Sequence, residues 1–479
     1  MARRTKIVAT IGPASASPAV LEQLVEAGMD VARLGLAHGR LEDTLHTLAA
    51  IRQVADRQGR VVGVLADLPG PKIRAGEFPE GGVFFAEGDR VRLAPGTGPS
   101  GSDCIEVDHA SLLDELDPGD MVALGDGGIE LRVDAVEPDA ALTTAVSGGR
   151  VQGRPGVNLP PDKISTSTPT AEDLRLLRAV VAEGVDVVAV SFVQSAADME
   201  RVRKAAGPDG PFLVAKIETP AALDDLDAII AASDGVMVAR GDLGVRARLE
   251  DVPHHQKRII RTCVAYGVPV ITATQMLESM VYAPTPTRAE VSDVANAVFD
   301  GTDAVMLSGE TAIGHDPVLV VRTMARIAER AEREADYVAW GGRLGKLQKA
   351  TLATAPPALR VTSAITAAAW RAALEVGARA VICCTRSGAT ARAMARFRPT
   401  APILAVSPTF RTARQLTLTW GTRPVAVNVQ RSTDDIVWIA VEQACALGIA
   451  GPGDIVVVLA GSPEDPEPAT DVLRVVRVR

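Results

Sequence analysis

Aromatic residues and paired cysteines are scarce in this chain, and no apolar run is long. Phe, Trp and Tyr make up 3% of its 479 residues, so its cores must be aliphatic. The five cysteines are odd in number and show no CxxC spacing, which excludes a disulfide framework and a zinc ribbon. No stretch reaches about 18 apolar residues, and no signal-peptide core follows Arg3 and Arg4, so we predict a cytoplasmic protein without membrane partners.

A basic excess is also absent. The formal net charge is −9, with the acidic residues spread along the chain, whereas nucleic-acid and membrane-surface binders carry basic patches. Nucleic acid is therefore excluded as a partner. The chain is too long for one core, and we expect about three domains.

Short apolar runs alternate with segments of helical period, which is typical of a parallel sheet built from βα units. Eight runs of this kind are found, at residues 6–11, 30–36, 61–67, 185–192, 212–218, 235–241, 269–275 and 303–309. Their number predicts a (β/α)8 barrel.

The interval between residues 67 and 185 is much longer than the others and predicts an inserted domain. Its period-two alternation and Gly-rich turns indicate a small antiparallel β domain. A Gly- and Pro-containing linker and a further α/β segment predict a C-terminal open-sheet domain. We expect barrel parts at residues 1–70 and 164–340, the inserted domain at 71–163 and the C-terminal domain at 341–479.

Working residues of a (β/α)8 barrel project from the C-terminal ends of its strands. Polar residues occur near seven of these predicted ends: Arg33 and His38, Asp67, Ser191, Lys216 and Glu218, Arg240 and Asp242, Thr272 and Thr274, Ser308 and Glu310. Residues two apart on a strand share a face, so we expect each of the pairs 216/218, 240/242 and 272/274 to point one way.

Two carboxylates and several cations in this set indicate phosphoryl transfer. Glu218 and Asp242 match the small number of carboxylates that Mg²⁺ prefers, because this ion keeps waters and takes oxygens from phosphate. Lys216, Arg33 and Arg74 add the positive charge that a transferring phosphoryl group needs. Any one of these cations could instead form a structural ion pair, and their joint occurrence favours the functional interpretation.

The sequence strongly resembles the pyruvate kinase family over essentially its whole length. Matching motifs include Arg3-Arg-Thr-Lys-Ile-Val-Ala-Thr-Ile-Gly-Pro, Ala215-Lys-Ile-Glu and Met237-Val-Ala-Arg-Gly-Asp-Leu-Gly-Val, and longer matches cover residues 270–280, 286–298 and 301–312. The resemblance implies transfer of a phosphoryl group from phosphoenolpyruvate to ADP, giving pyruvate and ATP. It also implies Mg²⁺ or Mn²⁺, a homotetramer, and an inserted small β-barrel that closes as a lid.

The family's residue roles can be carried over position by position. Glu218 and Asp242 resemble the metal ligands, Lys216 and Arg33 the residues that hold the transferring phosphoryl, and Thr274 the hydroxyl of a proton relay. The backbone of Arg240, Gly241 and Asp242 resembles the contact for the substrate carboxylate. The resemblance assigns the nucleotide contacts to Arg74, His38 and Arg154.

Several positions depart from the family pattern. K⁺-dependent members carry side-chain oxygens where this chain has Gly35 and Ala37, and an Asp-Thr pair where it has Asp67-Leu68. Lys72 replaces a Glu, and Leu68 with Lys72 resembles the K⁺-independent branch of the family, in which a lysine ammonium can stand where the monovalent ion stood. The resemblance therefore implies activity without K⁺, with Lys72 and Asp67 in place of the cation site. A lid lysine is replaced by Pro155, and an acidic residue after Asp242 is replaced by Arg246.

The loop formed by Thr385, Arg386, Ser387, Gly388 and Thr390 resembles the phosphate-binding loop for an effector. The acidic segment 461–468 opposes a sugar bisphosphate, so the loop could serve only as a helix cap. Two alternatives stay open: a divergent paralogue with another substrate or nucleotide, and a catalytically weak regulatory or binding subunit.

Overall fold

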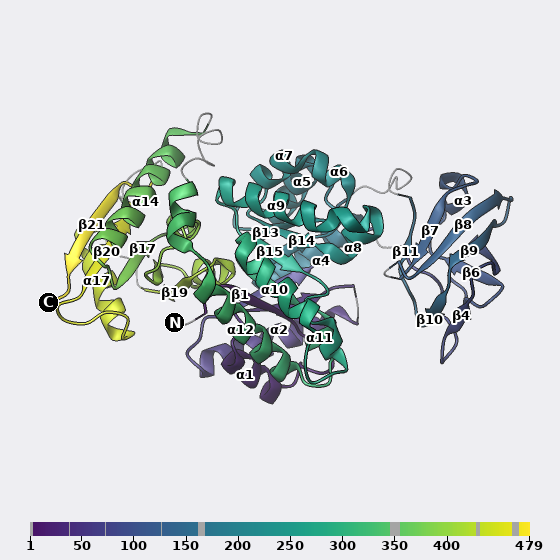
Figure 1. The fold of residues 1–479 in the computed structure, drawn as a ribbon, viewed down its shortest axis with the longest axis horizontal. Helices are drawn as coiled ribbons and strands as arrows, with labels where there is room; N and C mark the ends of the chain where they lie inside the picture. Colours follow the sequence, from purple (N-terminus) through teal and green to yellow (C-terminus); the bar gives the residue numbers. More distant parts are fainter. Residues whose placement is uncertain are drawn as a thin grey trace.

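The computed structural model describes residues 3–37, 39–71, 73–125, 127–160, 168–344, 355–427, 432–461 and 469–479. Figure 1 shows a central barrel with a small sheet domain on one side and an α/β domain on the opposite side. We find no helix in the described ranges with the length and apolarity that a bilayer crossing requires. All five cysteines are free thiols.

The barrel is closed by eight parallel strands, as the sequence predicts. Its order is β1-β16-β15-β14-β13-β12-β3-β2, and Lys6 on β1 pairs with Ala304 on β16 to complete the ring. The strands are β1 (Lys6–Thr10), β2 (Val31–Gly35), β3 (Gly63–Asp67), β12 (Val187–Val190), β13 (Phe212–Ile217), β14 (Gly235–Ala239), β15 (Val270–Ala273) and β16 (Ala304–Leu307).

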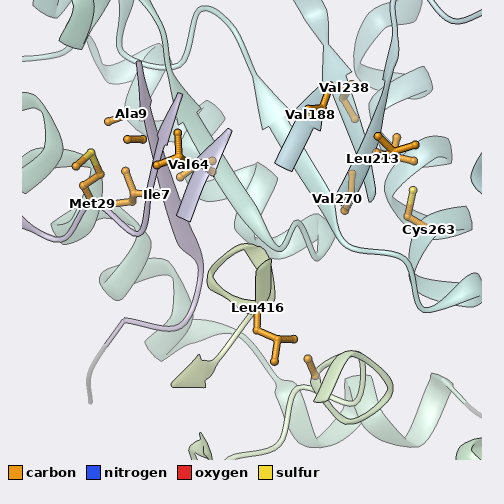
Figure 2. Packing of buried hydrophobic residues seen from close by; sticks show 14 of the residues in the cluster. Ile7, Ala9, Met29, Val64, Val188, Leu213, Val238, Cys263, Val270 and Leu416 are labelled. Atoms are coloured by element: carbon orange, nitrogen blue, oxygen red, sulfur yellow. The ribbon is translucent and has the colours of Figure 1, made fainter. Parts of the chain in front are cut away.

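Alternate strand residues build two cores. On β13, Phe212 and Val214 fill the barrel interior, whereas Leu213 and Ala215 pack outward against the helices. Figure 2 shows this outer layer, in which Leu213 and Val270 lie near Cys263 of a surrounding helix. Aliphatic side chains supply nearly all of this packing, as the scarcity of aromatics requires.

The barrel helices lie outside the strands. They are α1 (Pro18–Ala27), α2 (Leu41–Arg57), α4 (Ala171–Ala182), α5 (Ala196–Ala206), α6 (Pro220–Asp224), α7 (Leu226–Ala232), α8 (Arg240–Arg246), α9 (Val252–Tyr266), α10 (Arg288–Asp300), α11 (Gly309–Ala312) and α12 (Pro317–Glu334), with the 3-10 turns η1 (Leu249–Asp251) and η2 (Glu278–Val281). Capping hydrogen bonds fix the N-termini of several of these helices. On α10 the Thr287 hydroxyl accepts from Glu290 N, and the Glu290 carboxylate accepts from Thr287 N.

The inserted segment forms a separate small sheet domain with its own core. Its strands pair as a six-stranded sheet of order β11-β7-β8-β9-β5-β6 and a two-stranded sheet of β10 with β4. The elements are β4 (Val83–Phe85), β5 (Arg90–Pro95), β6 (Cys104–Val107), α3 (Leu112–Glu115), β7 (Met121–Leu124), β8 (Ile129–Val136), β9 (Ala141–Ser147), β10 (Gly149–Val151) and β11 (Val157–Asn158). One pair, β5 with β6, is parallel, because the loop between these strands carries the chain back before β6 begins.

The C-terminal domain is an open five-stranded sheet of order β19-β18-β17-β20-β21. Its elements are α14 (Pro357–Glu375), β17 (Ala380–Cys384), α15 (Ala389–Ala395), β18 (Ile403–Ser407), α16 (Phe410–Gln415), η3 (Leu416–Leu418), β19 (Thr422–Ala426), α17 (Thr433–Ala446), β20 (Ile455–Ala460) and β21 (Val472–Arg477). The antiparallel edge strand β21 was not predicted from the sequence. The domain boundaries at residues 70/71, 163/164 and 340/341 stay predictions.

The barrel and the C-terminal domain share buried surface at the N-terminal ends of the barrel strands. Leu416 belongs to the core between the strands and the surrounding helices, and Leu418 packs against the side chains of the barrel interior at the N-terminal ends of the strands. Figure 2 shows Leu416 below the barrel strands, on the segment of the C-terminal domain that contacts β1 and β3. The Lys6 ammonium donates to the carbonyl of Thr422 across this junction at 2.7 Å. The opposite, C-terminal ends of the strands are left for the candidate site.

Candidate active site

Lys216 is the centre of a buried charge cluster at the C-terminal ends of the barrel strands. Its Nζ lies 2.8 Å from Glu218 Oε1 and 3.4 Å from Asp67 Oδ1, and it donates to Ser191 Oγ at 2.7 Å. These residues come from three neighbouring strands, β3, β12 and β13, whose ends converge there. Burial alone would lower the pKa of Lys216, but Asp67, Glu218 and Asp242 outweigh it and raise this pKa. The ammonium therefore stays charged.

Glu218 follows β13 directly and is fully buried. Burial raises the pKa of its carboxyl, the Lys216 ammonium opposes the shift, and the negative charge of Asp242 adds to it. The backbone amide of Phe192 donates to Oε2 at 2.6 Å, whereas Oε1 faces the Lys216 ammonium at 2.8 Å. Interaction between the two carboxyl groups places Glu218 and Asp242 in one neighbourhood, as the sequence predicts.

Arg33 on β2 extends the cluster toward β1. Its Nε donates to Asp67 Oδ2 at 2.7 Å and its Nη1 to Thr10 Oγ1 at 2.9 Å. Burial tends to raise the pKa of Asp67, but Lys216 and Arg33 outweigh this and lower it. Asp67 is thus an ionised carboxylate that holds both cations in place.

Arg240 begins α8, and its guanidinium is engaged away from Lys216. Nη1 binds both carboxylate oxygens of Asp293 on α10, at 2.6 and 2.8 Å, and Nη2 donates to the carbonyl of Thr274 at 2.6 Å. The expectation that Arg240 and Asp242 point one way is wrong, because β14 ends at Ala239 and both residues are helical. Arg240 fixes α8, and Asp242 interacts with Lys216 and Glu218.

Thr274 lies just beyond β15 with a left-handed backbone, at φ 66°. Its Oγ1 accepts from Gly241 N at 2.7 Å, which joins it to the start of α8. Thr272 does not accompany it: its hydroxyl donates to Thr302 Oγ1 in the buried interior. Side chains alternate between two faces only as far as the strand extends, and β15 ends at Ala273. The expectation that Thr272 and Thr274 share a face is therefore wrong.

Arg74 and Arg154 meet at the base of the inserted domain, where Arg74 bridges to Gly156. Arg74 Nη1 donates to the Arg154 carbonyl at 3.1 Å, while its buried Nη2 has no hydrogen-bond partner among the described residues. Burial lowers the pKa of Arg74, and the charge of Arg154 lowers it further. His38 and Lys72, predicted for the nucleotide and for the cation site, lie outside the described residues.

The donor set suits a divalent ion that is only partly held by protein. Within the described ranges, no group of three or more His, Cys, Asp or Glu side chains is arranged to bind a metal. Glu218 and Asp242 are two carboxylates whose charges interact, and Glu218 Oε1 already faces one cation, the Lys216 ammonium. This pair fits Mg²⁺, which takes its other ligands from water and phosphate.

Comparison with known proteins gives matches along the chain. The model for the pyruvate kinase barrel domain matches residues 2–321, and that for the pyruvate kinase alpha/beta domain matches residues 363–476. The chain belongs to the pyruvate kinase family. The pyruvate kinase of Methylorubrum extorquens is 41% identical over 99% of this chain and 97% of its own length. Those of Mycobacterium tuberculosis and Geobacillus stearothermophilus are each 40% identical, over 100% and 99% of this chain and 99% and 80% of their own lengths.

Pyruvate kinases generally use Mg²⁺, which agrees with the carboxylate pair. Full-length matches to pyruvate kinases do not favour the alternatives of a divergent paralogue or a binding subunit. The motifs around Lys216, Asp242 and Thr274 all lie within residues 2–321, the range that matches the barrel domain of the family.

The predicted effector loop is held by one hydrogen bond within it and by two bonds to other segments of the C-terminal domain. Gly388 N donates to Thr385 Oγ1 at 3.0 Å, Thr390 Oγ1 lies 2.7 Å from Thr470 Oγ1, and Thr412 donates to the carbonyl of Arg386. These bonds engage two of its hydroxyls, whereas Ser387 contributes none of them. The companion segment 462–468 lies outside the described residues, so effector binding stays a prediction.

Three contacts at the site were missed from the sequence. They are the Phe192 amide on Glu218, the Thr10 hydroxyl on Arg33 and the stacking of Arg246 on the Phe192 ring. The position of Thr10 at the end of β1 was a usable signal, because polar residues were sought at every other strand end. The amide contact and the stacking have no counterpart in sequence spacing.

Proposed function

We propose that this chain catalyses transfer of a phosphoryl group from phosphoenolpyruvate to ADP, giving pyruvate and ATP. The observation that carries the proposal is the buried Lys216 ammonium, held between Asp67 and Glu218 at the strand ends beside the Glu218/Asp242 pair. In phosphoryl transfer, fixed positive charge stabilises the group in flight, so a site preorganised in this way suits the reaction.

The proposed roles follow from chemistry and position. Glu218 and Asp242 hold Mg²⁺ or Mn²⁺, which supplies positive charge to the substrate oxygens when bound. Lys216 and Arg33 orient the phosphoryl group as its bond to the enol oxygen breaks and its bond to the terminal oxygen of ADP forms. The hydroxyl of Thr274 takes part in moving a proton to the methylene carbon of enolpyruvate. Backbone amides of Arg240, Gly241 and Asp242 bind the substrate carboxylate.

Nucleotide binding is proposed for the side of the site that faces the inserted domain. The buried Nη2 of Arg74 has no partner in the part of the chain that the structure describes, which supports a phosphate contact there. Arg154 and His38 complete the proposed set. Closure of the inserted domain as a lid excludes water, which would otherwise accept the phosphoryl group.

We further propose activity without K⁺. A Cβ added to Gly35 would meet no atom within 4 Å, and neither Gly35 nor Ala37 offers a side-chain oxygen to a monovalent ion. Leu68 is buried and apolar. In this proposal the Lys72 ammonium stands beside Asp67 in place of K⁺.

One assay tests both proposals: the purified protein is given Mg²⁺, ADP and phosphoenolpyruvate in K⁺-free buffer, and pyruvate is measured. Equal rates with and without added K⁺ are expected. No pyruvate under either condition would overturn the proposed reaction, and a strict K⁺ requirement would overturn the role of Lys72.

A homotetramer located in the cytoplasm is proposed as the working form. Exposed apolar side chains on the barrel surface support association, among them Leu249 and Tyr282, which is 88% exposed. Sedimentation equilibrium measures the assembly, and a monomeric mass across the concentration range would contradict it.

A further inference from the structure

Arg246, the last residue of α8, places another cation beside the proposed metal carboxylates. Its guanidinium carbon lies 4.7 Å from the centroid of the Phe192 ring, a stacking distance. Burial lowers the pKa of Arg246, while the charges of Glu218 and Asp242 oppose that shift. Both carboxylates are therefore near enough to attract the guanidinium.

Neither Glu218 nor Asp242 forms a hydrogen bond or an ion pair with the Arg246 guanidinium. Among the described residues, none accepts a hydrogen bond from Arg246, and no carboxylate lies within the 4.0 Å of an ion pair. Its Nε is buried and has no partner. A buried donor without an acceptor is unfavourable, so in a folded protein such a group is normally satisfied by water, an ion or a ligand.

The charges of the neighbourhood identify the class of that ligand. Asp67 is paired with Arg33 and Lys216, and Glu218 with Lys216. A divalent ion on Glu218 and Asp242 would occupy the two carboxylates that now attract Arg246. The Arg246 guanidinium would then lie beside the divalent ion with no free carboxylate to compensate its charge. An anionic ligand would compensate the positive charges of the guanidinium and of the ion. The planar fork of an arginine matches the oxygens of a phosphate group.

Arg246 also lies toward the inserted domain, where a nucleotide is proposed to bind. A Cβ added to Gly127 of that domain would lie 3.5 Å from the side chain of the neighbouring Val245. The end of α8 thus borders both the barrel mouth and the inserted domain.

We propose that Arg246 is an additional phosphate-binding residue of this site, which donates to a phosphate oxygen of one substrate while it stacks on Phe192. This inference rests on the proposed function, since it takes phosphoenolpyruvate and ADP as the two sources of phosphate. It differs from a packing role because it requires the positive charge and the planar fork.

Calorimetric titration with phosphoenolpyruvate and, separately, with ADP, each in the presence of Mg²⁺, tests the proposal without turnover. Arg246→Gln is expected to bind one of the two ligands about tenfold more weakly, since hydrogen bonds to charged groups have that magnitude. The affected ligand identifies the phosphate. Arg246→Lys, which keeps the charge, should fall between Arg246→Gln and the wild type.

The matched control is Arg248→Gln, two residues further along. Arg248 is 81% exposed and forms a surface ion pair with Glu250, so its loss should leave both affinities unchanged. Mn²⁺ binding without substrate, followed by electron paramagnetic resonance, separates a charge effect from structural damage. Removing a nearby positive charge should leave Mn²⁺ binding unchanged or tighten it.

Unchanged affinity of Arg246→Gln for both ligands overturns the proposal, and so does equal binding by the Lys and Gln variants. Weaker binding of both substrates and of Mn²⁺ together, with a lower Tm, assigns Arg246 a packing role and also overturns it. These results are distinct from failure of the proposed function, which appears as absence of pyruvate formation by the wild-type protein.

Discussion

Thr274 combines an unfavourable backbone with a fixed hydroxyl. A φ of 66° is rare for a β-branched residue, and such a conformation costs about 1–3 kcal/mol. The surrounding structure enforces it: Oγ1 accepts from Gly241 N at 2.7 Å and donates to the Ala273 carbonyl at 2.6 Å. Strain held in this way at the mouth of the barrel agrees with the proposed proton relay.

Thr274→Ala should therefore lower kcat by about 10²-fold, a typical contribution of proton transfer, with KM for phosphoenolpyruvate changed less. Thr274→Ser keeps the hydroxyl and should retain most of the activity. Steady-state kinetics, with incorporation of solvent deuterium into the methyl group of pyruvate, measures both effects. Wild-type turnover in the alanine variant would exclude the relay.

Asp30 shows how a single buried carboxylate ties the chain's start to the barrel. Its Oδ2 lies 2.8 Å from Arg3 Nη1 and accepts from Ile7 N at 2.9 Å, while Oδ1 lies 3.6 Å from Lys6 Nζ. Burial tends to raise the pKa of Asp30, but Arg3, Lys6 and the amide outweigh it and lower the pKa. The ionised form therefore stabilises the fold above the ordinary carboxyl pKa, and this contribution is lost as pH falls through the lowered value.

Asp30→Asn should reduce the free energy of unfolding by about 3 kcal/mol at neutral pH, because Lys6 keeps a buried charge without its partner. The difference from the wild type should narrow below the ordinary carboxyl pKa. Calorimetric Tm values across the acid range measure this, with Glu22→Gln, which breaks a half-exposed pair with Arg57, as the control. A difference that does not depend on pH would show that the Asp30 charge is not responsible.

Among the elements, the junction of β16 with the C-terminal domain depends on one buried ion pair. Arg398 Nη1 donates to Asp303 Oδ1 at 3.0 Å, and the guanidinium carbon lies 4.7 Å from the Trp420 ring centroid. Trp420 N also donates to Asp303, at 3.2 Å. Asp303 thus links the N-terminal end of β16 to the segment before β18, through Arg398, and to the segment before β19, through Trp420.

Arg398→Met should destabilise this junction by about 3 kcal/mol, since Asp303 keeps a buried charge. We expect the C-terminal domain to unfold in a separate, earlier calorimetric transition. Arg371→Met, which removes only the exposed pair with Glu375, should leave the profile as in the wild type. A profile for Arg398→Met identical to the wild type would contradict the linking role.

Prediction from the sequence succeeded at this scale where periodicity is strong. The eight barrel strands lie within a few residues of the apolar runs, because buried parallel strands leave uninterrupted aliphatic sequence. It failed at β21, an edge strand whose Val472–Arg477 run has exposed residues on both faces. It also failed for β5 with β6, since a sequence does not state in which direction two strands pair.

The same distinction holds for the candidate site. Lys216 and Glu218 could be placed together because strand alternation reaches them, and the structure joins them at 2.8 Å. Thr272 and Arg240 could not, because their partners Thr302 and Asp293 lie about 30 and 50 residues further along the chain and no local pattern encodes those contacts.

At the scale of the whole molecule, three domains have separate structural roles. The barrel supplies the strand ends, the inserted domain lies on one side of the barrel, and the C-terminal domain lies on the other side and packs against the barrel interior through Leu418 (Figure 1). The central claim is that phosphoryl transfer takes place at Lys216, Glu218 and Asp242.

Parallel formation of pyruvate and ATP from phosphoenolpyruvate and ADP, followed in the wild type, in Lys216→Met and in Lys204→Met, tests this claim most directly. Lys204 is exposed on α5 and serves as the matched control. The wild type and Lys204→Met should form both products in equal amounts. Lys216→Met should remain folded by circular dichroism and lose at least about 10²-fold in kcat, since a preorganised charge has that magnitude. Absence of product in the wild type, or wild-type turnover in folded Lys216→Met, would contradict the account.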